Sequence, residues 1–250
     1  MSDVVRIVQI TDMHLRMPPG PLRGMARSTE DTLIQVLKYV ERSDKDLILC
    51  TGDLADTPDE KTYRRLIELL TPLDSPVFCL PGNHDDPALA KIISKGTALI
   101  WEKIIEAGDW LIIMLDSYLK GVIHGQLGKH ELDFLRVTLD NNPDKYTLVC
   151  LHHHPVKTGS KWMDDIMLQD YAALFSILKQ HKQVKGLLWG HIHQEFEEKM
   201  DGILFLGTPS TCRQFKAQED QFALDNSPPA YRELELLDSG EIKTSVIRCI

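Results

Sequence analysis

Five short hydrophobic runs in this chain each end in a cluster of residues that can bind metal ions. In chain order, these clusters are Asp12-Met13-His14, Gly52-Asp53, Gly82-Asn83-His84, His152-His153-His154 and Gly190-His191-Ile192-His193. Ligands of open α/β folds bind at the carboxyl ends of the strands, so the clusters are expected to meet at one rim of a sheet. Their oxygen and nitrogen donors predict a two-metal site, and with it a metal-dependent hydrolase of phosphate esters.

The spacing inside each cluster has a simple structural interpretation. Residues i and i+2 of a strand point to the same side, so Asp12 and His14 are expected to face one site together. Gly52 and Gly82 are expected to let the backbone turn sharply after their strands, which places the next side chain over the sheet edge. Each cluster alone is common in proteins. Their joint occurrence, in order and at strand ends, is what predicts an active site.

The elements that must position these clusters alternate between strands and amphipathic helices. Ser28 is the expected N-cap of a helix in which Leu33, Leu37 and Val40 recur at helical spacing. Further helices are expected over 62–70, 88–94, 131–139 and 169–181, and further strands over 110–116, 202–206 and 243–249. The segments 16–27 and 215–230 are expected to be irregular. Strands in two sheets with helices outside predict a layered α/β sandwich, with residues 1–250 as one domain.

Composition restricts the partners and the compartment. The chain has 28 basic and 37 acidic residues, a balance that does not favour a nucleic-acid binder. Its longest apolar stretch near the middle, 110–115, is too short for a membrane span. We expect no signal peptide, because Met1–Asp3 leads directly into a strand. The five scattered cysteines are typical of buried thiols in a reducing compartment, so we expect a cytoplasmic protein with a small-molecule substrate and no membrane partner.

The order of the five clusters resembles that of the calcineurin-like metallophosphoesterases, from Val5 to about Cys212. Flanking residues are also similar to those of the bacterial class III 3′,5′-cyclic AMP phosphodiesterases, over residues 9–15, 51–55, 80–85, 151–155, 190–195 and 208–212. The resemblance implies a four-layer α-β-β-α sandwich with its active site at the carboxyl ends of the strands. It also implies hydrolysis of 3′,5′-cyclic AMP to 5′-AMP, which lowers the concentration of a second messenger.

The same resemblance implies how the ions are bound. One ion takes Asp12, His14 and His193, and the other takes Asn83, His191 and one histidine of the triple run. Asp53 bridges the two. His152 is the expected third ligand because it comes first after the strand and precedes Pro155 by three residues; His154 is the alternative, and His153 is expected to point away. The family favours iron and manganese, and the donor types also suit magnesium, cobalt and zinc.

Catalytic roles are implied by the resemblance as well. With two ions roughly 3.5–4 Å apart, a water held between them loses a proton near neutral pH and attacks phosphorus in line with the departing 3′ oxygen. His84 is expected to protonate that oxygen or to stabilise the charged transition state. Asp56 is expected to orient His84 through a hydrogen bond. The residues expected to contact the substrate are His14, Asp53, Asn83, His84, His193 and Thr211.

Four alternative functions compete with this interpretation. The closest is a broad-specificity phosphodiesterase or phosphomonoesterase, because metal ligands do not discriminate between esters. The protein-phosphatase and dinucleoside-polyphosphatase branch usually has Arg-Gly where this chain has Thr57-Pro58, and the lipid-precursor pyrophosphatase has arginine in place of His84. A non-catalytic metal-binding scaffold typically loses ligands or the acid histidine, which are all present here. The metal, the preferred cyclic nucleotide and the oligomeric state are not determined by the sequence.

Overall fold

The computed structural model describes residues 4–250 as a mixed α/β fold built on two six-stranded sheets. Residues 1–3, on which the expectation about a signal peptide rests, lie outside the described residues. The first sheet contains β1 (Val5–Ile10), β2 (Leu47–Thr51), β3 (Val77–Leu80), β4 (Leu99–Ile100), β13 (Ala230–Leu236) and β14 (Ile242–Arg248), in the order β14-β13-β1-β2-β3-β4. The second contains β5 (Ile104–Ala107), β6 (Trp110–Met114), β7 (Tyr146–Cys150), β8 (Val184–Trp189), β9 (Phe196–Met200) and β10 (Ile203–Gly207), in the order β5-β6-β7-β8-β10-β9.

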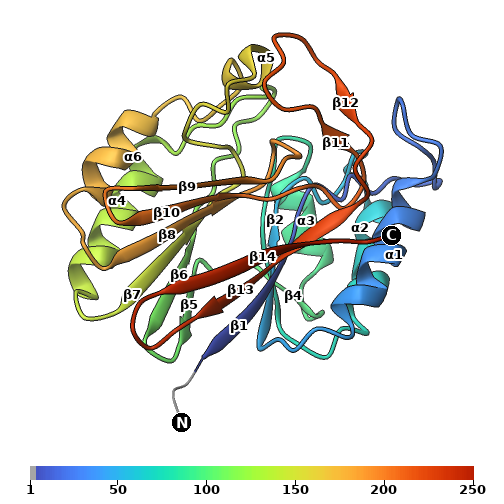
Figure 1. Ribbon diagram of the computed structural model, residues 1–250. Coiled ribbons are helices and arrows are strands. Elements are labelled where there is room, and N and C mark those ends of the chain that lie inside the picture. The colour runs from blue at the N-terminus through green and yellow to red at the C-terminus, as the bar shows by residue number, and fades with distance from the viewer. Residues whose placement is uncertain (1–3) are drawn as a thin grey trace.

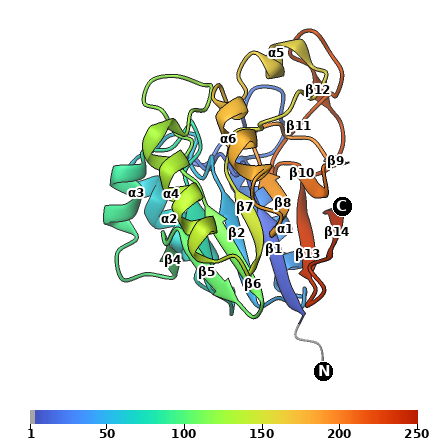
Figure 2. The same cartoon turned by 90° about the vertical axis from the view of Figure 1, so that its left-hand side faces the viewer.

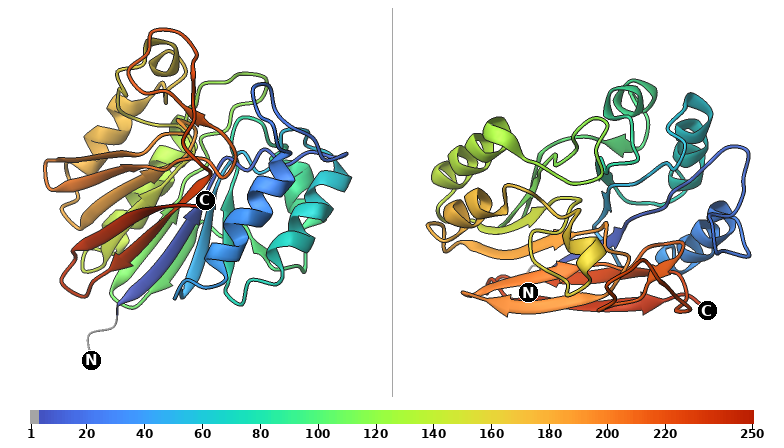
Figure 3. Two further views of the ribbon diagram at one scale, coloured as in Figure 1. Left: turned by 45° about the vertical axis from the view of Figure 1, so that its right-hand side comes forward. Right: turned by 90° about the horizontal axis from the view of Figure 1, so that it is seen from above.

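Helices cover the outer face of each sheet, so the molecule has four layers (Figure 1). The helices α1 (Thr29–Val40), α2 (Glu60–Leu70) and α3 (Pro87–Ile93) pack on the first sheet. The helices α4 (Gly128–Asn141) and α6 (Tyr171–Leu178) pack on the second (Figure 2). Turning the molecule the other way brings α1 and α2 forward (Figure 3). The expected α-β-β-α sandwich is confirmed.

Three hydrophobic cores separate the four layers, and the period of two in the strands assigns residues to them. In β1, Ile7 faces the core between the two sheets, whereas Val8 faces the core under α1. In β6, Ile112 belongs to the core between the sheets and Ile113 to the core under α4. Because both faces of these strands are buried, their sequences read as continuous apolar runs.

Most elements lie where the sequence predicts them. Ser28 is the N-cap of α1, and its side chain accepts a hydrogen bond from the amide of Asp31. The strands β4, β5, β9 and β13 had no predicted counterpart. The segment 215–230 was expected to be irregular, but the short strand β11 (Gln214–Phe215) extends into it and β12 (Leu224–Asp225) lies within it. Charged residues such as Arg232 and Glu233 interrupt the apolar pattern from which a buried strand is predicted, because a buried position normally carries an apolar side chain. The sequence therefore did not predict β13. Among residues 4–250, no helix has the length and apolarity that crossing a membrane requires.

A buried polar network joins the two sheets just below the rim that carries the clusters. The side-chain Nε2 of Gln9 donates to Thr51 Oγ1 at 2.7 Å and to the Trp189 carbonyl at 3.2 Å, which links β1 and β2 to β8. Thr208, after β10, donates to Gln9 Oε1 and accepts from Nε of Arg232 at 3.0 Å. Arg232 is fully buried in β13, and burial lowers its pKa to about 10, so the side chain stays charged at neutral pH.

We expect Arg232→Met to lower the free energy of unfolding by about 3 kcal/mol, because it leaves buried oxygen acceptors without their donors. These acceptors include Thr208 Oγ1, Thr244 Oγ1 and the Gly207 carbonyl. The matched control is Arg248→Met on β14, where the arginine pairs with Glu195 at the surface. Loss of this exposed ion pair is expected to lower the free energy of unfolding by only about 0–1 kcal/mol. Urea unfolding of both variants measures the difference. Equal stabilities would contradict a stabilising role for the network.

Candidate metal centre

The residues expected to bind metal lie in loops with an unusual backbone conformation. Five of them have positive φ: Asp12 (53°), His14 (44°), Asp53 (50°), His191 (67°) and His193 (48°). Aspartate and histidine adopt this left-handed region more readily than most residues, yet each such residue remains uncommon and strained. The predicted pairing of side chains by strand alternation was therefore wrong in its mechanism, because the donors follow the strands and converge through left-handed turns.

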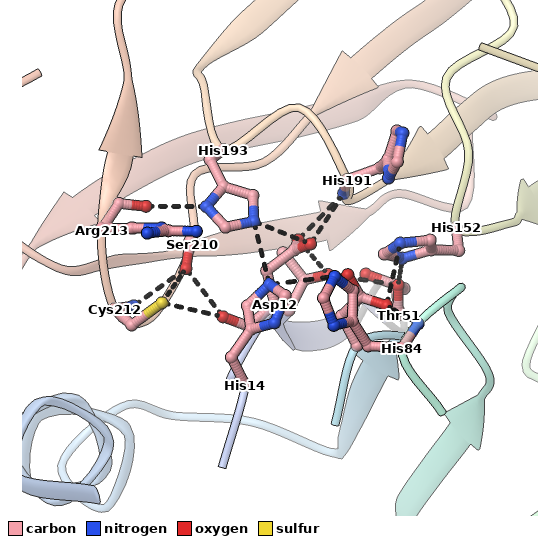
Figure 4. A network of polar contacts seen from close by, with 12 residues as sticks. Asp12, His14, Thr51, His84, His152, His191, His193, Ser210, Cys212 and Arg213 are labelled. Atoms are coloured by element: carbon pink, nitrogen blue, oxygen red, sulfur yellow. Dashed lines mark hydrogen bonds and ion pairs between the residues drawn. The ribbon is translucent and has the colours of Figure 1, made fainter. Parts of the chain in front are cut away.

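A first group of donors consists of Asp12, His14 and His193 (Figure 4). His193 Nε2 lies 3.2 Å from Asp12 Oδ1 and 3.2 Å from His14 Nε2, and all three side chains are buried. Ligand atoms about 2.1 Å from a shared cation lie about 3.0–3.4 Å from one another at ordinary coordination angles. The spacing of this group therefore fits a single cation.

Asp53 connects this group to a second one. Its Oδ2 lies 3.5 Å from His14 Nε2, whereas its Oδ1 lies 3.4 Å from His152 Nε2. The two carboxylate oxygens thus face different groups, which is the arrangement of a carboxylate that bridges two ions.

The second group contains buried donor atoms without hydrogen-bond partners in the described part of the chain. Two of these atoms are Nε2 of His152 and Nε2 of His191, whose ring centroids lie 5.1 Å apart. Oδ1 of Asn83 is another buried atom without a hydrogen-bond partner. A buried polar atom left unsatisfied costs about 1–3 kcal/mol, so these atoms are costly to bury unless a cation satisfies them. The residues present fit a pair of metal ions.

Backbone carbonyls set the orientation of two of the imidazoles. His152 Nδ1 lies 2.8 Å from the Thr51 carbonyl, and His193 Nδ1 lies 2.8 Å from the Arg213 carbonyl. Because a carbonyl can only accept, Nδ1 must carry the proton in each ring. Nε2 then presents its lone pair to the site, which is the usual support of a metal-binding histidine.

The triple histidine run divides into three different environments. Only His152 of the three lies beside Asp53, and among the described residues His154 belongs to no group of donor atoms within 4.8 Å of one another. The expectation that His153 points away was wrong, because its ring centroid lies 4.7 Å from that of His191. Both of its ring nitrogens have other partners, Ser117 Oγ at 2.8 Å and the Ile123 carbonyl at 3.0 Å. The geometry favours His152 as the ligand.

Charge around the site favours binding of cations. Burial pulls the pKa of His152 down, but the carboxylates of Asp53 and Asp12 outweigh it and raise the pKa to about 9. Burial outweighs the same carboxylates at His14 and lowers its pKa to about 3. A cation must therefore displace a proton from His152, so metal affinity is expected to fall as the pH falls below about 9.

His84 lies at the open side of the site. Its side chain is 41% exposed, and its ring meets that of His14 edge to face at 4.7 Å between centroids. The expected hydrogen bond to Asp56 is not formed, because His84 Nδ1 and Asp56 Oδ1 lie 3.7 Å apart. Asp56 Oδ1 also lies 3.9 Å from His14 Nδ1, so this carboxylate is close to both rings without a hydrogen bond to either.

Thr211, an expected substrate contact, has no exposed surface. Its amide donates to the Thr11 carbonyl at 3.2 Å, and its hydroxyl has no hydrogen-bond partner within residues 4–250. Its contact with a substrate stays a prediction.

Asp85 is a residue whose role the sequence did not reveal. It is buried, and its carboxylate accepts hydrogen bonds from the amides of Leu54, Ala55 and Gly82 and from the hydroxyl of Tyr63. Burial, with the nearby charge of Asp53, raises the pKa of Asp85 to about 6. These hydrogen bonds tie the loop after β2 to the loop after β3. In the sequence, the only indication of a role for Asp85 is its position directly after His84.

Two glycines of the clusters have different reasons to be glycine. Gly52 has a φ of 95°, as the expected sharp turn requires, and a Cβ there would overlap the His152 ring. Gly82 has no positive φ, so the predicted turn is not its role; a Cβ there would overlap the Asp53 carboxylate. Gly82 permits the close approach of two loops.

Comparison with known proteins identifies the family of this chain. The sequence profile of the calcineurin-like phosphoesterases matches residues 5–195. The chain is 40% identical to the 3′,5′-cyclic adenosine monophosphate phosphodiesterase CpdA of Haemophilus influenzae and 39% identical to that of Pseudomonas aeruginosa; each match covers 98% of this chain and 90% of the relative. Among solved structures, a dimetal phosphatase from Danio rerio has the same fold, with a TM-score of 0.67 at 14% identity over 98% of this chain and 99% of that one. This protein therefore belongs to the calcineurin-like phosphoesterase family.

Proposed function

We propose that the protein hydrolyses 3′,5′-cyclic AMP to 5′-AMP at a two-metal site and so lowers the concentration of this second messenger. The observation that carries the proposal is the convergence of two donor groups on the two oxygens of Asp53. The assignment of the substrate rests on relatives that are 37–40% identical over 98% of the chain and are named 3′,5′-cyclic AMP phosphodiesterases. The donors come from both sheets, which supports one domain over residues 1–250.

The two ions would be held by separate sets that share Asp53. The first set is Asp12, His14 and His193, and the second is Asn83, His152 and His191. We favour iron and manganese, and the absence of a thiolate from both sets also permits magnesium, cobalt or zinc. When bound, the ions supply positive charge for the phosphoryl oxygens and a water that is acidic enough to attack phosphorus.

Residues of this chain would complete the reaction. His84 would donate a proton to the departing 3′ oxygen, since it is the exposed histidine at the edge of the donor groups. Asp56, whose Oδ1 lies 3.7 Å from His84 Nδ1, would orient that ring toward the leaving oxygen. Residues proposed to contact the phosphate are His14, Asp53, Asn83, His84 and His193, with Thr211 proposed to border the nucleotide.

The environment of the protein is part of the proposal. All five cysteines are free and buried, which supports a reducing compartment such as the cytoplasm. The formal net charge of −9 supports a small-molecule substrate over a nucleic acid.

Hydrolysis by the metal-stripped protein, reconstituted with manganese or iron, tests the proposal directly. The panel is cyclic AMP, cyclic GMP, 2′,3′-cyclic AMP, a nitrophenyl diester and a nitrophenyl monoester. We expect cyclic AMP to be the best substrate, to give 5′-AMP, and to be turned over only after metal is restored. A preference for the other esters would favour the alternative, a broad-specificity phosphodiesterase or phosphomonoesterase.

The role of His84 predicts a difference between leaving groups. We expect His84→Ala to slow cyclic AMP hydrolysis by roughly 10²–10⁴-fold, because an alkoxide needs a proton as it departs. Hydrolysis of a nitrophenyl diester should fall far less, since nitrophenolate leaves without a proton. His130→Ala, at an exposed histidine outside the site, is the control. An equal loss on both substrates would contradict the acid role.

Metal content distinguishes the histidines of the triple run. We expect His152→Ala to lose one of the two ions, because it removes the Nε2 that faces Asp53, and His154→Ala to keep both. Elemental analysis of both variants after reconstitution with manganese measures this, with thermal unfolding as the control for folding. The opposite result would make His154 the ligand.

A further inference from the structure

The segment between β10 and β12 is an unexplained part of the site. Residues 210–215 lie outside the part of the chain that the family profile matches, which ends at residue 195. They nevertheless contact two of the proposed metal ligands, Asp12 and His193, both in the first group (Figure 4). We call this segment the 210–215 clamp.

On one side, the clamp holds the backbone around Asp12. Ser210 Oγ donates to the Asp12 carbonyl at 2.7 Å, and the Thr211 amide donates to the Thr11 carbonyl at 3.2 Å. The thiol of Cys212 lies 3.4 Å from the same Asp12 carbonyl. These contacts fix a residue whose φ of 53° needs support from its surroundings.

On the other side, the clamp holds His193 in three ways. The Arg213 carbonyl accepts from His193 Nδ1 at 2.8 Å, and the Phe215 amide donates to the His193 carbonyl at 3.1 Å. The Phe215 ring is stacked on the His193 ring, with 4.0 Å between centroids and 7° between planes. The imidazole is therefore held both in its plane and along its ring normal.

Phe215 is itself held by other aromatic rings. Trp162 and Phe222 meet its edge at centroid distances of 5.2 Å and 5.3 Å, and they also meet each other at 5.2 Å. The guanidinium of Arg213 lies 5.6 Å from the Phe215 centroid. Neither Trp162 nor Phe222 stacks on a proposed ligand within the described residues. Phe215 is therefore the ring through which this aromatic cluster contacts His193.

The clamp reaches only one of the two donor groups. Within residues 4–250, its hydrogen bonds and ring contacts with proposed ligands go to Asp12 and His193. His152, in the second group, is oriented instead by the Thr51 carbonyl, and His191 packs against other histidine rings. Within residues 4–250, the direct contacts of the clamp with proposed ligands therefore support the first metal position.

We infer that Phe215 is a positioning residue that presets His193, so that the affinity of the first metal position depends on the 210–215 clamp while the second does not. The inference rests on the metal assignment of the proposed function. It goes beyond that assignment by predicting unequal sensitivity of the two positions to a residue that binds no metal.

Manganese binding to the full-length protein tests the inference without a substrate. We expect Phe215→Leu, which keeps apolar volume and loses the ring, to weaken one of two Mn²⁺ sites by about 10–100-fold in calorimetry. Electron paramagnetic resonance should then show an isolated Mn²⁺ where the wild-type protein shows a coupled pair. Phe215→Tyr, which keeps the aromatic ring, should bind Mn²⁺ at both sites with wild-type affinity. Phe222→Leu, which removes a ring of the same cluster that does not touch His193, is the matched control.

Each outcome has a defined meaning. Two wild-type affinities in Phe215→Leu would overturn the positioning role and leave the metal assignment intact. Equal weakening of both sites, or weakening as strong in Phe222→Leu, would also overturn it, because the effect would then follow the stability of the loop. A wild-type protein that binds no Mn²⁺ would overturn the metal assignment and the clamp together.

Discussion

The site depends above all on a backbone constraint: five donor residues are held in the left-handed region at the ends of strands. Each such residue costs on the order of 1–3 kcal/mol, so neighbouring loops must hold it in place. The amide of Asp12 donates to the Gly52 carbonyl at 3.0 Å, and the amide of His14 donates to the Asp53 carbonyl at 2.9 Å. The amide of His191 in turn donates to Asp12 Oδ2 at 2.9 Å. The ligand loops therefore stabilise one another.

This mutual support requires both sheets. Asp12, Asp53 and Asn83 follow strands of the first sheet, whereas His152 and His191 follow strands of the second. The buried network of Gln9, Thr51, Thr208 and Arg232 lies at the same end of the strands and joins the sheets through directional hydrogen bonds. Apolar packing between the sheets lacks that directionality, so the polar network sets how the loops of one sheet meet those of the other.

Burial and exposure divide the site into two parts. The carboxylates and the histidines proposed as ligands are almost completely buried, which keeps water away from the donors and strengthens their attraction for cations. His84 is the exception, since its side chain is 41% exposed. The buried donors proposed to bind metal thus adjoin one accessible imidazole, and the proposed proton transfer to a leaving group needs such an accessible residue.

The sequence by itself determined the types of the site residues, their order along the chain and the α/β class, because these depend on local periodicity and on residues next to strand ends. The Ser28 cap and the five clusters are examples, since each is a short-range signal. Only the tertiary structure decided how the donors converge, because the left-handed turns, the hydrogen bonds of Asp85 and the place of the His153 ring arise from contacts between loops far apart in the chain. The stacking of Phe215 on His193 and the burial of Arg232 in β13 belong to the same class. No periodicity records such contacts, since each depends on two segments that meet only in the folded protein.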